Sequence, residues 1–217
     1  MTEYLGKGIY RPSEAASYIG TESQRLRYWF RSRPGVESPP LLHSDFEELG
    51  DDLLISFLGL IDAMVTKKLV EQGVSVQHIR RAYQTLQEEW GIPHPFTDRR
   101  LSTDGRRIYI ALEEEIAEVL SKQHFFESVM DPFLTQVTYD DATDLAAVWR
   151  PADGVQLNPR VSFGKPVVEG TGTTTFVLHQ AWVANKQDFE RVADLYELSE
   201  EQVKAAVRYQ EGLGRAA

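Results

Sequence analysis

The chain has 217 residues, of which 42% are hydrophobic and 26% are charged, and its formal net charge is -10. This composition is typical of a folded globular protein with room for one large domain or two smaller ones. The absence of cysteine excludes disulfides and thiolate metal sites and fits a reducing compartment. The first residues lack the pattern of a signal peptide, and no apolar run approaches the roughly 18 residues that a membrane span needs. We therefore expect a cytoplasmic protein with no membrane contact.

Two short helices joined by a tight turn are predicted near the N-terminus. The first covers residues 12–19, because Pro12 suits the first turn of a helix and Gly20 readily adopts the left-handed backbone that ends one. The second covers residues 23–31, with its apolar residues on one face. Its polar face presents hydrogen-bond donors and carries Gln24, Arg25, Arg27, Tyr28 and Arg31.

Local charge favours nucleic-acid binding by this helix pair. Residues 11–33 hold five Arg and two Glu in a chain that is acidic as a whole. A basic face is what contact with DNA phosphates requires, so the pair is predicted to be a DNA-binding helix-turn-helix. The alternative is structural, since two amphipathic helices separated by glycine also occur in helical proteins that do not bind DNA.

The segment that follows predicts a small wing and then two long helices. Leu41 and Leu42 come after Pro39-Pro40 and are expected to form a short strand beside the second helix. Apolar residues with helical spacing over residues 53–73 predict one long helix. A second is expected to begin at the capping residue Ser75 and to end at Gly91.

A basic β-hairpin is predicted over residues 92–110. Asp104-Gly105 is a strong signal for a two-residue hairpin turn, and apolar residues alternate on both sides of it. The ribbon would contact nucleic acid or an acidic partner, or it would be a solvated surface with no partner. Its basic residues are Arg99, Arg100, Arg106 and Arg107.

The second half of the chain is predicted to hold helices over residues 111–134, short strands and turns over residues 135–157, and three C-terminal helices. The last three begin near Thr174, Lys186 and Ser199 and form a trihelical unit with an acidic or mixed outer face. Residues 1–110 carry 14 Lys and Arg against 15 Asp and Glu, whereas residues 111–217 carry 9 against 18. The acidic half, residues 111–217, would be repelled by DNA and is suited to dimerisation or to binding a protein partner. The alternative is that its acidic surface serves solubility alone.

No residue pattern in the chain predicts an enzyme. A nucleophile with a base, a set of metal ligands and a phosphate-binding loop are all missing at useful spacing, and His78 has no second ligand near it. We therefore expect no catalytic residues, no cofactor and no bound metal.

Two resemblances extend this interpretation. The segment SEAASYIGTESQRLRYWF, with Leu26-Arg27-Tyr28 in its second helix, resembles the helix-turn-helix of MerR-type regulators. Residues 54–90, with Gly73-Val74-Ser75, resemble the helical region that follows it in that group.

The C-terminal segment is similar to a small bacterial family first described as a domain of unknown function and associated with VapB-type antitoxins. The similarity rests on Asn158-Pro159-Arg160, Phe163-Gly164-Lys165-Pro166-Val167-Val168, Gly170-Thr171 and Val192-Ala193-Asp194-Leu195-Tyr196. Gly172 stands where the family pattern has a basic residue, so a partner surface there would be altered.

Together the resemblances imply a mainly α protein with small β-hairpins, divided into three parts. Residues 1–91 would form a MerR-like, winged helix-turn-helix region, residues 92–150 a connector with the basic hairpin, and residues 151–217 a small trihelical antitoxin-type domain. The implied function is that of a homodimeric antitoxin that neutralises a PIN-like ribonuclease toxin and represses its own promoter. Two alternatives stay open: a MerR-type regulator that responds to a small ligand, and a protein-interaction scaffold that does not bind DNA.

Overall fold

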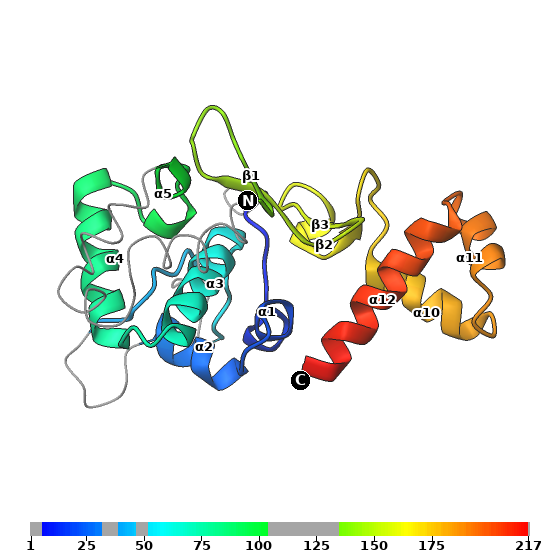
Figure 1. Ribbon diagram of the computed structural model, residues 1–217, viewed down its shortest axis with the longest axis horizontal. Helices are drawn as coiled ribbons and strands as arrows, with labels where there is room; N and C mark the ends of the chain where they lie inside the picture. The colour runs from blue at the N-terminus through cyan, green and yellow to red at the C-terminus, as the bar shows by residue number, and fades with distance from the viewer. Residues whose placement is uncertain (1–5, 32–38, 47–51, 104–134, 217) are drawn as a thin grey trace. The chain divides into compact units, whose positions relative to one another are not determined.

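The computed structural model describes residues 6–31, 39–46, 52–103 and 135–216, and the chain divides into two compact units (Figure 1). The first, called the helix-pair unit here, is Tyr10–Ala147, and the second, the C-terminal unit, combines Met1–Ile9 with Val148–Ala217. The described elements are mostly helices with one small sheet, so the predicted mainly α class is confirmed. Within the described ranges, no helix is both long enough and apolar enough to cross a bilayer.

The helix-pair unit begins with the two short helices expected from the sequence. Helix α1 is Pro12–Ile19 and helix α2 is Ser23–Phe30, which agrees with the predicted bounds to within one residue. The backbone amide of Arg11 donates to the Glu14 carboxylate (2.9 Å), and this bond closes the start of α1. Gly20 ends the helix with φ of 67°, a left-handed conformation that turns the chain sharply into α2.

Two longer helices follow in this unit. Helix α3 is Phe57–Glu71 and begins at Ser56, whose hydroxyl accepts a hydrogen bond from the Gly59 amide (3.0 Å). Helix α4 is Val76–Trp90, and the predicted start at Ser75 and end at Gly91 are both confirmed. These caps satisfy backbone groups that would otherwise lack partners at the helix ends.

The predicted wing strand is wrong for the residues on which it was placed. Leu41 and Leu42 are buried, but they lie in irregular backbone and pair with no strand. The Leu42 amide instead donates to the Trp29 carbonyl at the end of α2 (2.9 Å). These two leucines are therefore apolar because they are buried against the helices, and they take no part in β-strand pairing.

The prediction of a strand as the first arm of the basic hairpin is also wrong. Residues Pro95–Thr97 form a 3-10 helix, η1, and residues Arg100–Thr103 form one turn of helix, α5. Proline at residues 93 and 95 has no amide hydrogen to give a strand ladder, which disfavours a strand there. The Asp104-Gly105 turn, the second arm and the predicted helices over residues 111–134 lie outside the described residues.

A small antiparallel sheet follows, as the prediction of short strands and turns required. Its strands are β1 (Val137–Tyr139), β2 (Ala146–Ala152), β3 (Val155–Leu157) and β4 (Val167–Val168), in the order β1-β2-β3-β4. Trp149 of β2 lies opposite Leu157 of β3, and Val155 of β3 lies opposite Val168 of β4. A second 3-10 helix, η3 (Ser162–Gly164), links β3 to β4.

The three predicted C-terminal helices are confirmed. They are α10 (Thr175–Ala184), α11 (Phe189–Tyr196) and α12 (Glu200–Ala216), with α10 and α11 packed against α12 (Figure 1). The backbone amide of Ser199 donates to the Gln202 side chain (2.9 Å) and the Gln202 backbone amide donates to the Ser199 hydroxyl (3.3 Å), so a capping box closes the start of α12. The core of the unit consists of Val168, Leu178, Val192, Ala193, Val203, Ala206 and Val207.

Candidate functional site

The outer face of α2 presents the donors that the sequence predicted. Leu26, Trp29 and Phe30 are buried, which turns the opposite side of the helix to solvent. All five predicted residues of that side, Gln24, Arg25, Arg27, Tyr28 and Arg31, are exposed. The Gln24 amide nitrogen donates to the Tyr28 hydroxyl (2.8 Å), so these two side chains are held together one turn apart. Three arginines of like charge therefore share one surface around α2, which we call the α2 face.

The hairpin arginines lie in a different place. Arg99 Nη2 lies 2.7 Å from Asp141 Oδ1, and Arg100 Nη2 lies 2.7 Å from Asp98 Oδ2. The Arg100 guanidinium also lies over the Trp90 ring, 4.3 Å from the ring centroid. Figure 1 shows α5 and α2 at opposite ends of the helix-pair unit. Any phosphate would compete with these carboxylates, so Arg99 and Arg100 do not extend the α2 face. Arg106 and Arg107 lie outside the described residues.

The C-terminal unit is less acidic than the charge of the second half suggested. Residues 148–217 hold eight Lys and Arg against nine Asp and Glu, whereas residues 111–147 hold one Lys against nine Asp and Glu. The acid excess therefore belongs to residues 111–147, and the outer face of the trihelical unit, predicted to be acidic or mixed, is mixed, because Lys186, Arg191 and Arg208 are exposed on it. The exposed acids on those faces include Glu190, Asp194, Glu197, Glu200 and Glu201.

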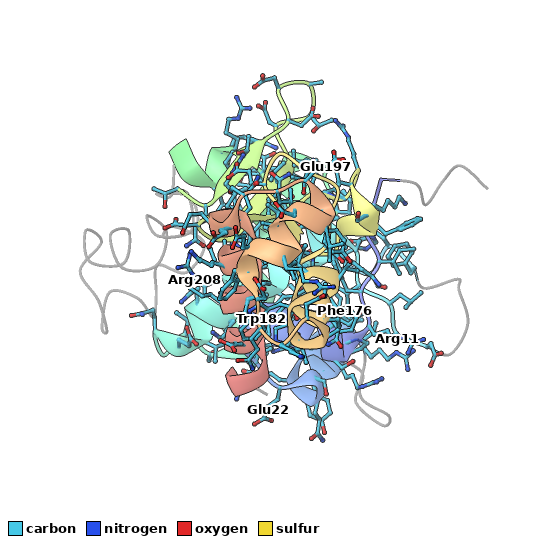
Figure 2. All side chains as sticks on the ribbon, turned by 90° about the vertical axis from the view of Figure 1, so that its right-hand side faces the viewer. Arg11, Glu22, Phe176, Trp182, Glu197 and Arg208 are labelled. Atoms are coloured by element: carbon cyan, nitrogen blue, oxygen red, sulfur yellow. The ribbon has the colours of Figure 1, made fainter. Side chains whose placement is uncertain are left out.

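Helix α10 of that unit is apolar on its exposed side as well as its buried side. Leu178 is fully buried, while Phe176 is 59% exposed and Val183 is 51% exposed (Figure 2). Trp182 is partly buried and stacks on Phe189, with ring centroids 5.2 Å apart. Several large apolar side chains exposed on one helix are ordinarily covered by a partner, so the exposed side of α10, with Phe176, Val177 and Val183, is a candidate protein contact.

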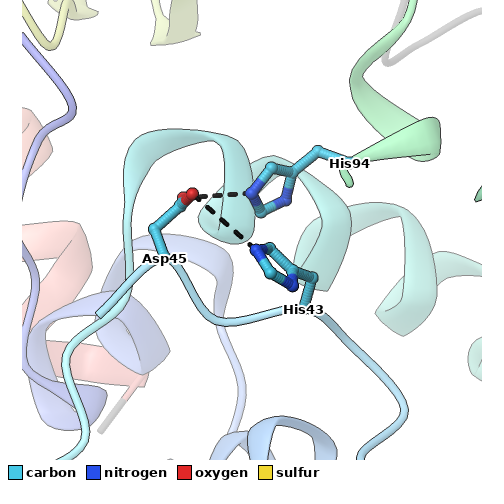
Figure 3. A group of neighbouring side chains, drawn as sticks. All are labelled: His43, Asp45 and His94. Carbon is cyan, nitrogen blue, oxygen red and sulfur yellow. Dashed lines mark hydrogen bonds and ion pairs between the residues drawn. The ribbon is translucent and has the colours of Figure 1, made fainter. Parts of the chain in front are cut away.

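A buried polar cluster in the helix-pair unit was missed by the sequence analysis. The Asp62 carboxylate, on the fully buried side of α3, accepts hydrogen bonds from the Tyr83 hydroxyl (2.6 Å) and from His94 Nδ1 (2.7 Å). The other ring nitrogen of His94, Nε2, lies 3.0 Å from Asp45 Oδ2. His43 Nε2 lies 4.0 Å from the second oxygen of Asp45, and Figure 3 shows that carboxylate facing both imidazoles. Four segments distant in sequence thus meet at one place.

The electrostatics of the cluster hold His94 in its charged form. Burial alone would lower the pKa of His94, but the carboxylates of Asp62 and Asp45 outweigh burial and raise that pKa to about 9. Burial raises the pKa of Asp62, and it also raises the pKa of the Tyr83 hydroxyl, whose proton is directed at Asp62. Burial would raise the pKa of Asp45 too, but the hydrogen bond from His94 holds it well below its usual range.

Only one signal in the sequence pointed to this cluster. Asp62 interrupts the apolar positions of the helix predicted over residues 53–73, and a carboxylate on a buried helix face needs a partner. His43, Asp45 and His94 carry no spacing signal, because up to 51 residues separate them. Their meeting depends on how α3 and α4 pack.

Comparison with known proteins identifies a matching family model and related chains. A family model described as "Protein of unknown function (DUF433)" matches residues 155–210, from β3 into α12. The chain is 24% identical over 222 residues to the Mycobacterium tuberculosis protein named "Putative antitoxin VapB45", and the match covers 92% of each chain. The crystal structure of Rv2018 from Mycobacterium tuberculosis superposes with a TM-score of 0.71 at 24% identity, over 91% of this chain and 96% of that one. The fold described above is therefore one already seen in a crystal, across nearly its whole length.

Proposed function

We propose that this protein is the antitoxin of a toxin–antitoxin pair, that it neutralises a PIN-like ribonuclease toxin by direct binding, and that it represses its own operon. The observation that carries the proposal is the similarity to a protein named as an antitoxin over 92% of both chains. The described residues also offer two distinct surfaces, the α2 face in one unit and the exposed side of α10 in the other.

Promoter binding is assigned to the α2 face, in a MerR-like helix-turn-helix. A helix with exposed Arg25, Arg27 and Tyr28 on one side and a buried apolar side can enter a major groove, where guanidinium groups reach guanine edges and phosphates. Arg31, just beyond the helix, would contact the flanking backbone. Two such helices are needed to read two half-sites about 34 Å apart, so the active form is proposed to be a homodimer.

Toxin binding is assigned to the C-terminal unit. Its exposed helix faces carry Glu190, Asp194, Glu197, Glu200 and Glu201, which repel phosphates, so the unit is poorly suited to DNA. The apolar side of α10 supplies the kind of surface that protein partners cover, with Phe176 as an aromatic anchor. The two activities would then reside in separate parts of the chain.

Replacing Arg27 with alanine is expected to weaken promoter binding about tenfold and to reduce the salt slope of the affinity by about one. The reason is loss of one guanidinium contact from an exposed position, which leaves the buried side of α2 intact. Fluorescence anisotropy with a labelled promoter fragment at several salt concentrations measures both quantities.

Arg208→Ala is the matched control, because it removes one exposed arginine from the C-terminal unit and should leave the affinity unchanged. Equal affinities for wild type and Arg27→Ala would refute the assignment of DNA binding to α2. Absence of any salt-dependent DNA affinity in the wild type would favour the protein-interaction scaffold.

The toxin partnership is tested by expressing the protein encoded by the adjacent reading frame. Growth arrest by that protein alone, rescue by this chain, and co-elution of the two on size exclusion are the expected results. Rescue should survive Arg27→Ala, because DNA and toxin contacts are proposed to lie in different units. A neighbouring frame that is not toxic, or whose toxicity this chain does not relieve, would contradict the proposal.

A further inference from the structure

The buried cluster of the helix-pair unit contains the ligand set of a transition-metal site. His43, Asp45 and His94 each offer one ligand atom, and these atoms all lie within 4.8 Å of one another (Figure 3). Ligands around a tetrahedral Zn²⁺ at about 2.0–2.1 Å lie roughly 3.3 Å apart. His94 Nε2 and Asp45 Oδ2 are already 3.0 Å apart, so the remaining adjustment of about 1–1.5 Å falls on His43. His43 has a 39% exposed side chain and can move that far by rotation.

His94 is oriented as metal-binding histidines are. Its Nδ1 is held by Asp62 at 2.7 Å, and the hydrogen bond from Tyr83 fixes the same carboxylate oxygen. Because Nδ1 faces Asp62, Nε2 is the ring nitrogen that is placed to ligate a metal, and it is directed at Asp45. A carboxylate behind a ligating imidazole is the recurrent outer shell of zinc sites, where it fixes the tautomer and increases ligand basicity. This arrangement is independent of the proximity of the three ligand atoms.

The charge of the cluster also suits a divalent cation. Within the described residues, the ion pairs of Asp45 and Asp62 are with histidines, and no Lys or Arg joins them. The lysines and arginines of the described residues therefore supply no positive charge to these two carboxylates, and a divalent cation would supply it.

We propose that His43, Asp45 and His94 bind one divalent ion of the zinc class, with Asp62 as the positioning residue behind His94 and water at the fourth position. Two imidazoles with one carboxylate favour Zn²⁺ and its first-row neighbours over Mg²⁺ and Ca²⁺, which take oxygen ligands. The site would join the segment between α2 and α3 to the start of η1. This assignment goes beyond the proposed antitoxin function and does not depend on it.

The test is metal titration of the full-length chain after dialysis against a chelator. Isothermal titration with Zn²⁺ should give one ion per chain, Co²⁺ should give visible absorption bands of a low-coordinate site, and Mg²⁺ should give neither. His43→Ala and Asp45→Asn should each weaken Zn²⁺ binding about 100-fold or more. Both remove a ligand that is partly exposed, so circular dichroism should show the wild-type fold.

His78→Ala is the matched control, because His78 lies on α4 with Ser75 and Arg81 as its partners and has no place in the cluster. Its Zn²⁺ affinity should equal that of the wild type. The proposal is overturned if the wild type shows no saturable binding of one Zn²⁺, or if His43→Ala and Asp45→Asn both bind Zn²⁺ as tightly as the wild type does. Loss of binding in His78→Ala with retention in His43→Ala would place the ion elsewhere and overturn it equally.

Discussion

Replacing Asp62 with alanine is expected to destabilise the helix-pair unit by about 3–5 kcal/mol. The substitution removes the partner of His94 Nδ1 and one of the two acceptors of the Tyr83 hydroxyl, and both side chains are almost completely buried. An imidazolium then remains beside Asp45 with one of its two N–H groups unpaired, while the Tyr83 hydroxyl keeps the Pro93 carbonyl as an acceptor (2.8 Å). Removing the buried carboxylate also relieves its desolvation cost. We expect that relief to be smaller than the stabilisation lost when the His94 imidazolium loses its carboxylate partner.

Urea unfolding of the metal-free protein, followed by tryptophan fluorescence, measures this change. Asp141→Ala is the control, because Asp141 is also paired with a cation, Arg99, but its side chain is 95% exposed. Screening by water limits the expected effect of that change to less than about 1 kcal/mol. A loss in Asp62→Ala no larger than that of Asp141→Ala would show that the cluster contributes little to the fold.

Replacing Leu178 with alanine is expected to cost about 3 kcal/mol and to unfold much of the C-terminal unit near body temperature. Leu178 is fully buried in the core of a unit of modest size, among Val168, Val192 and Val203. Truncation removes apolar contact area and leaves a cavity that three short helices can close only in part. Small cores have little stability to spare, so the fractional effect is large.

Phe176→Ala provides the comparison within the same helix. Phe176 is 59% exposed, so the free energy of unfolding of the isolated chain should change by less than about 1 kcal/mol. Thermal unfolding followed by circular dichroism, together with limited proteolysis of the C-terminal unit, separates the two variants. Similar losses for Leu178→Ala and Phe176→Ala would mean that the exposed side of α10 is covered in the free protein.

Local signals in the sequence were sufficient to predict most of the helices. Gly20, Ser75 and Gly91 mark helix ends because each satisfies a local backbone requirement, and the structure has a helix end at each of them. The buried and exposed sides of α2 followed from the spacing of Leu26, Trp29 and Phe30. These features depend on residues within about one helical turn of each other. They can therefore be predicted from the sequence without knowledge of the tertiary fold.

The errors arose where distant packing decides the outcome. Leu41 and Leu42 were predicted to form a strand because they are apolar and follow prolines, yet burial against helices satisfies the same preference. Arg99 and Arg100 were predicted to lie on the first arm of a hairpin, but in the structure they lie in a turn and in α5, where Asp141 and Asp98 pair with them. The cluster around His94 could not be predicted, since its members come together only after α3 and α4 have packed.

The hydrogen bond from the Leu42 amide to the Trp29 carbonyl predicts which substitutions will abolish repression. It connects the end of α2, the helix proposed to bind DNA, to the residue directly before His43. Substitutions that destabilise the buried cluster would therefore also destabilise the position of α2, although its exposed side chains stay unchanged. A search for variants that lose repression should therefore return substitutions at Asp62 or Tyr83 beside those at Arg27. The two groups would differ in temperature dependence: alleles of the buried group would recover repression on cooling, whereas alleles of the surface group would not.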